Sequence, residues 1–303
     1  MSLDPAGRAQ PGILAFGTTH HAYVELDLRA DADVDRLLTV VGDLVGGATT
    51  GTGFMLVVGF RPELWRRLDP ASCPEGVHGF DRPIVGPDGF TMPATQHDLV
   101  VWLAAGARDV LFDGVTGVVD TLAPLATVAD EEHGWEYRDH RDLTGFVDGT
   151  ENPPLVELPD HVLYADGGAA GASLLLLQRW PHEHSWMELS VEEQEQAIGR
   201  TKTDDVELDP KPEASHAART DQDDIGEILR RNMPYGSGTR HGTMFVGLTN
   251  DQAVMHRMLE RMAGVEGPRD LLTFHTRADT GAYYVLPPVP ALTAGWGGRR
   301  DGR

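Results

Sequence analysis

The chain has 303 residues, and its 47 aspartates and glutamates outnumber its 25 lysines and arginines, which gives a formal net charge of −22. With 41% hydrophobic residues the chain can bury a sizeable core, which argues against a mainly disordered protein. The acidic balance argues against nucleic acid and anionic membrane surfaces as main partners, because both bind basic surfaces. The length predicts two domains, or one domain built from two similar halves.

Cysteine content and hydropathy indicate the compartment. Cys73 is the only cysteine, so neither an intrachain disulfide nor a cysteine-rich metal cluster can form. The first residues lack the apolar segment of an export signal, and the longest leucine run, Leu174 to Leu177, is far shorter than the ~20 residues of a membrane span. We therefore expect a soluble, cytoplasmic protein with no membrane partner.

The hydrophobic periodicity of the first half predicts strands and helices that do not alternate strictly. Residues 135–142 then form a polar stretch with little regular structure. The predicted elements are a strand at Ala22–Leu28, a helix at Asp31–Val45, strands at Phe54–Phe60 and Asp98–Ala104, and a helix at Arg108–Leu122.

The second half repeats this theme. Residues 98–115 and 243–259 share one pattern, a strand followed by a short polar break and an amphipathic helix. We therefore predict an α+β fold with antiparallel sheets and two halves, residues 1–145 and 146–303. The predicted elements are strands at Ala172–Trp180, Thr243–Leu248 and Tyr283–Leu286, helices at Val191–Ile198 and Asp251–Gly264, and a short helix that ends at Arg230, Arg231 and Asn232.

Two short motifs have an ordinary explanation. The glycine-rich segment Gly46–Gly53 lacks the lysine of a phosphate-binding loop, so we interpret it as a helix end and a loop. The His182-Glu183-His184 sequence has residue types that suit a divalent metal. However, Pro181 indicates that the preceding strand has ended, so we expect a surface loop there.

Three other segments gather residues with chemical potential. Residues 141–154 combine two glycines, three acids and Asn152 within a short stretch. Residues 211–220 place His216 among small neighbours, which leave room for a bulky group against the imidazole. Residues 227–236 hold two arginines and Asn232 before Pro234. Each segment alone fits a turn or a helix end, so none of them separately indicates an enzyme.

Together the three segments resemble the dye-decolourising peroxidases in order and approximate spacing, and the chain is most similar to their shorter, bacterial B-type branch. The resemblance is carried by GFVDGTENP at 145–153, ASHAART at 214–220, and the arginine pair with asparagine before MPYG. QPGIL at 10–14 and AIGRTKTDD at 197–205 extend the resemblance over nearly the whole chain.

The resemblance implies a fold of two ferredoxin-like halves with antiparallel β-sheets and peripheral helices, as in the dimeric α+β barrel superfamily. It also implies one haem b per chain, held mainly by the C-terminal half, with His216 as the axial ligand of the iron. Three residues would be catalytic: Asp148 as acid–base group, Arg230 as stabiliser of developing negative charge, and Asn232 as their partner. The residues expected to contact the cofactor are Gly149, Thr150, Glu151, Arg200, His216 and Arg230.

The implied reaction is the reduction of hydrogen peroxide to water by heterolytic O–O cleavage, with one-electron oxidation of dyes, phenolics or Mn²⁺. An aspartate base predicts an optimum on the acid side of neutrality, because its ordinary pKa is about 3.9. Relatives imply a homo-oligomer, a dimer or a trimer of dimers. The basic tail Gly295–Arg303 lacks an apolar encapsulin-docking tag, so we expect no encapsulation. The alternative is a haem-handling or haem-storage protein of the same fold.

One departure concerns the axial histidine, which usually donates its other N–H to a carboxylate. In many relatives an aspartate stands where this chain has Thr273. The uncharged Thr273 predicts a weaker anionic character of His216 and a higher iron potential, unless Asp270 takes the place of that aspartate.

Overall fold

The computed structural model describes residues 4–47 and 53–294. Most of the glycine-rich segment Gly46–Gly53 therefore lies outside the described residues, and so does the tail Gly295–Arg303. No helix within the described ranges is long and apolar enough to cross a membrane.

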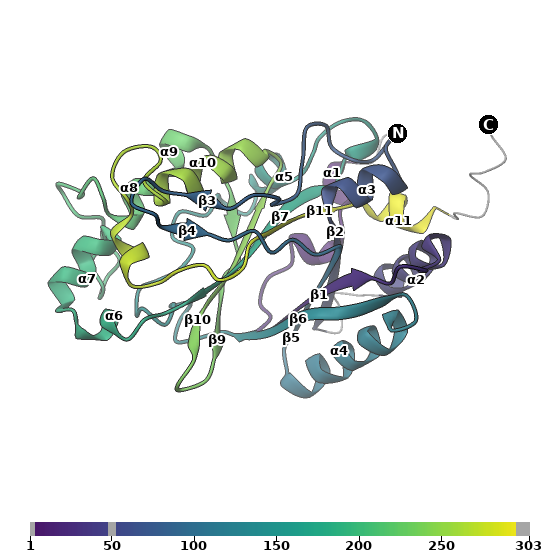
Figure 1. Ribbon diagram of the computed structural model, residues 1–303, viewed down its shortest axis with the longest axis horizontal. Coiled ribbons are helices and arrows are strands. Elements are labelled where there is room, and N and C mark those ends of the chain that lie inside the picture. Colours follow the sequence, from purple (N-terminus) through teal and green to yellow (C-terminus); the bar gives the residue numbers. More distant parts are fainter. Residues whose placement is uncertain (1–3, 48–52, 295–303) are drawn as a thin grey trace.

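A closed antiparallel barrel forms the centre of the protein (Figure 1). Its eight strands run in the order β7-β11-β2-β5-β1-β6-β9-β10, and the pairing of β10 with β7 closes the ring. The short β8 continues the line of β9 along β10, and β3 and β4 form a separate hairpin. The strands are β1 (His20–Leu28), β2 (Phe54–Phe60), β3 (Ile84–Val85), β4 (Thr91–Met92), β5 (Leu99–Ala105), β6 (Ala126–Trp135), β7 (Ser173–Pro181), β8 (Leu229–Arg230), β9 (Met233–Gly236), β10 (His241–Thr249) and β11 (Ala282–Leu286).

The barrel contains one set of adjacent strands from each half of the chain. The first half supplies the order β2-β5-β1-β6, and the second half supplies β11-β7-β10 with β9 and β8. The two sets meet at narrow joints, because β6 pairs with β9 only at Gly134 and Tyr235, and β11 pairs with β2 only at Val285 and Phe60. The long ladders therefore lie within each half.

Helices cover the outer face of the barrel. Figure 1 shows α2 and α4 together at one end and α6 to α10 gathered at the other. The helices are α1 (Pro5–Arg8), α2 (Val34–Gly47), α3 (Pro62–Leu68), α4 (Arg108–Leu122), α5 (Leu158–Val162), α6 (Ser185–Glu188), α7 (Val191–Ile198), α8 (His216–Arg219), α9 (Gln222–Ile225), α10 (Gln252–Met262) and α11 (Val289–Thr293), with 3-10 turns η1 (Pro11–Ile13), η3 (Gly167–Ala169) and η4 (Leu271–Phe274).

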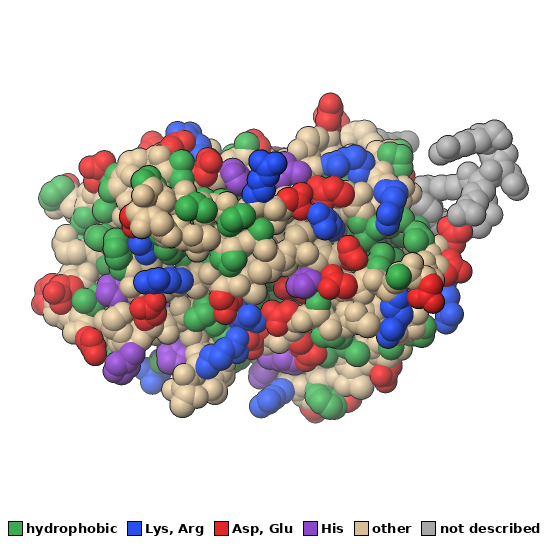
Figure 2. Space-filling model, viewed as in Figure 1, with side chains coloured by type: hydrophobic (Ala, Val, Ile, Leu, Met, Phe, Trp, Pro, Cys, Tyr) green, Lys and Arg blue, Asp and Glu red, His purple; other side chains and the backbone are tan. Residues whose placement is uncertain are grey.

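Strand alternation divides the apolar side chains into two large cores. Tyr23, Trp102 and Tyr284 belong to the core inside the barrel, whereas Val24 and Leu103 pack outward against the helices. Figure 2 shows acidic side chains scattered over the visible face, with basic side chains and histidines among them. The negative charge of the chain is therefore spread over this face and not gathered in one patch.

Most predicted elements are confirmed. The bounds of β2, α4 and α7 agree with the prediction. Local chemistry explains two helix starts: Ser190 and Glu193 form a capping box at α7, and the Asp251 side chain accepts a hydrogen bond from the backbone N–H of Ala253 at α10.

The structure differs from the predicted elements at two places. Arg230 to Asn232 do not end a helix, because Arg230 lies in β8, opposite Gly247 of β10. Strand β6 is absent from the prediction, although it pairs with β1 along most of its length. The outer side of β6 is largely exposed, so its charged residues hide the strand pattern.

Candidate active site

A cavity with about 1210 Å³ of space not filled by protein atoms, part of it open to solvent, is formed almost entirely by the second half of the chain. Every lining residue falls between Asp142 and Thr276. The cavity gathers side chains from the 142–151 loop, β7, α8, β8, β10 and α10. All eight residues expected at the site line it: Asp148, Gly149, Thr150, Glu151, Arg200, His216, Arg230 and Asn232.

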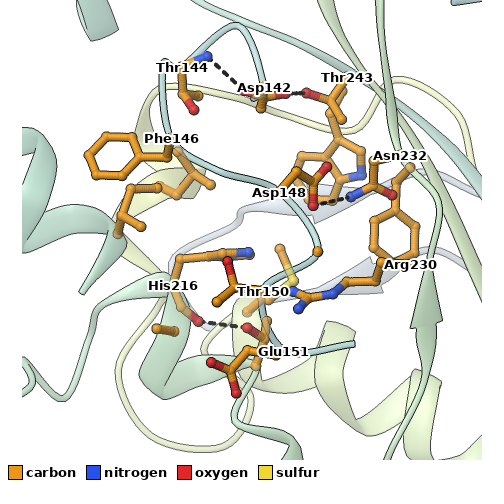
Figure 3. A pocket seen from close by; sticks show the side chains of 18 of the residues that line it. Asp142, Thr144, Phe146, Asp148, Thr150, Glu151, His216, Arg230, Asn232 and Thr243 are labelled. Atoms are coloured by element: carbon orange, nitrogen blue, oxygen red, sulfur yellow. Dashed lines mark hydrogen bonds between the residues drawn. The ribbon is translucent and has the colours of Figure 1, made fainter. Parts of the chain in front are cut away.

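The cavity wall is mainly apolar, with a few polar groups at defined points. Figure 3 shows His216 on one side and Asp148, Arg230 and Asn232 on the other. An apolar cavity with a few placed polar groups suits an organic cofactor. The apolar lining side chains are Phe146, Val147, Trp180, Ile198, Ala217, Ile228, Phe245, Met255, Met258, Leu259, Met262 and Leu272.

A tight loop places Asp148 in the cavity. Arg141 and Val147 form an isolated antiparallel bridge, and the backbone N–H of Asp148 donates to the carbonyl of His140 at 2.9 Å. Gly149 follows with φ of 83°, and a Cβ there would lie 2.9 Å from Asn152 Nδ2. Glycine is therefore required at position 149 for both its conformation and its close approach to Asn152.

Asn232 orients the Asp148 carboxylate. The backbone N–H of Val246 donates to Asn232 Oδ1 at 2.9 Å, which directs the amide nitrogen to Asp148 Oδ1 at 3.2 Å. Burial raises the pKa of Asp148 above its ordinary value, while Arg230 and Asn232 oppose this shift by favouring the charged form. The carboxyl is thus positioned to exchange protons at a less acidic pH than an exposed aspartate.

Hydrogen bonds fix the backbone of Arg230, whereas one nitrogen of its side chain, Nε, has no partner in the part of the chain that the structure describes. Its N–H donates to Asn152 Oδ1 at 2.8 Å, and its carbonyl accepts from Asn152 Nδ2 at 2.9 Å. The buried Arg230 Nε has no hydrogen-bond partner among the described residues. A buried donor without a partner is costly, so this nitrogen is suited to a ligand in the cavity.

His216 is held as a metal-ligand histidine would be. Its Nδ1 donates to Asp270 Oδ2 at 2.7 Å, and the Asp270 side chain is fully buried. Because the ring proton is on Nδ1, the lone pair of Nε2 remains free to bind a metal in the cavity. The prediction from Thr273 that His216 has a weaker anionic character is therefore wrong. Asp270, three positions before Thr273, supplies the carboxylate.

Arg200 lines the cavity within a group of carboxylates. Its guanidinium contacts Glu151 Oε1 and Asp205 Oδ1, each at 2.8 Å, and Glu207 Oε2 at 3.8 Å. Lys211 pairs with Glu207 as well. Glu151 and Glu207 thus lie together around Arg200, and the two cations Arg200 and Lys211 accompany them.

Asp142, Thr243 and His182 also line the cavity, and none of them was predicted at the site. The expectation that His182 belongs to a surface loop is wrong, because its side chain is only 7% exposed and its Nε2 lies 3.0 Å from Thr243 Oγ1. Strand β7 extends through Pro181 and β10 pairs along it, so the chain remains packed at this point. A histidine at position 182 is visible in the sequence. Its partners Thr243 and Asp142 are distant in the sequence, so residue spacing does not predict the contact.

Comparisons with known proteins agree along the chain. A family model described as Dyp-type peroxidase, N-terminal, matches residues 10–136, and the corresponding C-terminal model matches residues 139–291. A dye-decolorizing peroxidase of Mycobacterium tuberculosis is 35% identical over 95% of this chain and 90% of its own length. That of Rhodococcus erythropolis is 37% identical over 86% of this chain and 79% of its own length.

Solved structures give the same result. DyPB from Rhodococcus jostii RHA1 has a TM-score of 0.85 and is 34% identical, with 93% of this chain and 97% of that chain covered, and variants of it were solved in complex with heme. The dye-decolorizing protein from V. cholerae has a TM-score of 0.85 at 32% identity and covers 96% of this chain and 99% of its own. The encapsulated DyP-type peroxidase from Mycobacterium smegmatis has a TM-score of 0.85 at 32% identity, with coverage of 94% and 97%. With both family models matched and the cavity residues in place, the chain belongs to the dye-decolourising peroxidase family and is a peroxidase.

Proposed function

We propose that the chain binds one haem b in the cavity, where His216 Nε2 would bind the iron. The observation that carries this proposal is the His216–Asp270 hydrogen bond at 2.7 Å, opposite Asp148, Arg230 and Asn232 in one apolar cavity. The unpartnered Arg230 Nε and the Met- and Leu-rich wall also fit a flat macrocycle. When bound, haem supplies the iron that reacts with peroxide and stores the oxidising equivalents.

The residues opposite His216 would then transfer protons and stabilise negative charge. Asp148 accepts a proton from hydrogen peroxide and returns it to the departing oxygen, so that one oxygen leaves as water. The Arg230 guanidinium stabilises the negative charge that develops as the O–O bond breaks heterolytically. Asn232 holds the Asp148 carboxylate toward the cavity by the hydrogen bond described above.

The remaining cofactor contacts would come from the loop after Asp148 and from Arg200. Gly149 gives close backbone access, and Thr150 Oγ1 donates to Asp205 Oδ2 at 2.6 Å, which keeps the loop near Arg200. Arg200 and Glu151 line the cavity, and Arg200 would give the anionic edge of a haem a fixed cation to meet.

Absorption spectroscopy tests this function directly. The haem-loaded protein should show a Soret band that changes promptly on addition of one equivalent of peroxide. Asp148→Asn and Arg230→Leu should retain the Soret band and slow this change by about a hundredfold or more. An unreactive Soret band in the unmodified protein would favour the haem-storage alternative, and failure to bind supplied haem would refute the cofactor assignment.

The donors would be dyes and phenolics, with turnover highest on the acid side of neutrality. Mn²⁺ is a further candidate donor, because the Glu151 and Glu207 carboxylates lie together around Arg200. Saturable Mn²⁺ oxidation that is lost in Glu151→Ala would support this site. The cations Arg200 and Lys211 already pair with these carboxylates and would weaken the binding of Mn²⁺ there.

The architecture proposed for the chain is two ferredoxin-like halves, residues 1–145 and 146–303, of the B-type branch. In support, each half contributes strands in the same relative order, with two helical connections. We also propose a cytoplasmic homo-oligomer, a dimer or a trimer of dimers. Light scattering after size-exclusion chromatography distinguishes these states.

A further inference from the structure

A second group of acid–base side chains lies in the cavity beside Asp148. Asp142 accepts a hydrogen bond from the backbone N–H of Thr144 at 2.6 Å and another from Thr243 Oγ1. His182 Nε2 lies 3.0 Å from the same hydroxyl and 3.7 Å from Asp142 Oδ1. Figure 3 shows Asp142 joined to Thr144 and to Thr243, above Asp148.

The hydroxyl of Thr243 fixes the direction of this hydrogen-bond chain. A threonine hydroxyl has a single proton, which here is donated to the Asp142 carboxylate. His182 Nε2 must therefore be the donor toward the Thr243 oxygen. His182 therefore donates to Thr243, and Thr243 donates to Asp142, which is the direction needed to pass a proton inward.

Each end of this hydrogen-bond chain has a titratable neighbour. At the outer end, the His182 ring lies edge-on to His241, with ring centroids 6.2 Å apart, and His241 is partly exposed at the start of β10. At the inner end, the Arg141–Val147 bridge brings Asp142 and Asp148 to the same cavity.

Electrostatics couple the same groups. Burial has the largest effect on each, raising the pKa of Asp148 and lowering the pKa of His182. The charge of Asp142 acts on both and raises both pKa values, while His241 lowers that of His182. The charged groups that face Asp148 are Arg230, Asp142 and His216.

The reaction needs such a supply. Reduction of one hydrogen peroxide by two one-electron donors follows H₂O₂ + 2 e⁻ + 2 H⁺ → 2 H₂O, so two protons enter per turnover. A phenolic donor releases one proton with each electron, whereas a donor such as ABTS gives the electron alone. With the second kind of donor both protons must come from solvent.

We propose that His182, Thr243 and Asp142 form a proton-delivery path from the His241 side of the protein to Asp148. His182 takes up a proton at Nδ1 and releases the one on Nε2 to Thr243, whose own proton passes to Asp142 and then to the cavity. These three are positioning and relay residues, distinct from the group that meets peroxide. The inference rests on the acid–base role proposed for Asp148.

The test compares two donors on the haem-loaded protein. His182→Gln and Thr243→Val should lower turnover with ABTS by about tenfold or more above neutral pH, while turnover with 2,6-dimethoxyphenol changes by about twofold or less. The loss should grow as pH rises, because free protons become scarcer. Added imidazole should restore ABTS turnover in His182→Gly. The matched control is His184→Gln, since His184 is exposed on the same segment and should show no donor-dependent change.

A second measurement does not depend on haem. Histidine ring signals of the haem-free protein, followed by NMR over pH, should show a lower pKa for His182 in Asp142→Asn than in the unmodified protein. Equal losses with both donors, or an unchanged His182 titration, would overturn the path. Failure of the Asp148 assignment is separate: Asp148→Asn would then leave the first reaction with peroxide unaffected.

Discussion

At the scale of single residues, the carboxylate behind His216 sets what the histidine can do. Asp270 is buried and accepts from both His216 Nδ1 and the backbone N–H of Leu272. A carboxylate in this place fixes the ring orientation and increases the electron donation of the free nitrogen.

Replacing Asp270 by Asn should weaken haem binding by about 10- to 100-fold and raise the reduction potential of the bound iron. The asparagine oxygen can still accept from Leu272, so the turn at η4 should survive. Haem titration and spectroelectrochemistry measure the two effects. Thr273→Val is the control, because Thr273 bonds to Arg269 and to the Asp270 carbonyl and not to His216.

The pH dependence of the reaction with peroxide follows from Asp148. Its base form is the active one, so the rate should rise with pH around a midpoint above the ordinary aspartate value of about 3.9, because burial raises the pKa. Asn232→Leu removes a donor that favours the charged form, so the midpoint should move to higher pH. Stopped-flow rates across the acid range measure it, and a midpoint that moves down in this variant would contradict the assignment.

At the scale of elements, one side chain joins the Asp148 loop to β8. Asn152 makes a pair of hydrogen bonds to the Arg230 backbone, much as a neighbouring strand would. The position of Arg230 therefore depends on the loop that carries Asp148.

Asn152→Ala should cost about 1–3 kcal/mol of stability, because it leaves backbone groups of Arg230 without partners, and it should slow the reaction with peroxide by about tenfold. The matched control is Asn250→Ala, which removes hydrogen bonds to the carbonyls of Asp160 and Leu163 away from the cavity lining. Chemical denaturation should show a loss in both variants, whereas a slower peroxide reaction should appear in Asn152→Ala alone.

Sequence patterns predicted the elements whose own apolar residues are regularly spaced. They missed the elements that form only because another segment pairs with them. The strand Phe54–Phe60 and the helix Arg108–Leu122 follow from apolar spacing. Strand β8 has two residues and exists because β10 and Asn152 pair with it. In the site, motif resemblance located the residues of the Asp148 loop, but the His216–Asp270 contact joins positions 54 residues apart. Such pairs depend on the fold and not on spacing.

At the scale of the whole molecule, the barrel interior contains a titratable pair. Glu25 lies among apolar side chains, accepts a hydrogen bond from Tyr284, and has its pKa raised to about 7 by burial. The folded pKa exceeds the unfolded one, so this group favours the folded state below the unfolded pKa of about 4.3 and loses that contribution as pH rises through about 7.

The melting temperature should therefore fall between about pH 5 and pH 8, and Glu25→Gln should flatten this dependence, because glutamine carries no charge to bury. Differential scanning calorimetry of the haem-free protein separates the effect from cofactor binding. Glu63→Gln is the control, since Glu63 lies at the surface beside Arg61 and has its pKa lowered. An unchanged pH dependence in Glu25→Gln would contradict the assignment.

The residues that line the cavity all lie between positions 142 and 276, so the described residues before Asp142 contribute none of them. This gives the molecule a convenient handle for engineering. Helix α4 belongs to that earlier part of the chain, lies at the end of the barrel away from α6 to α10, and has Phe112 65% exposed (Figure 1). A linker, a fluorophore or an electrode could therefore be attached at position 112 without obstructing the residues that line the cavity.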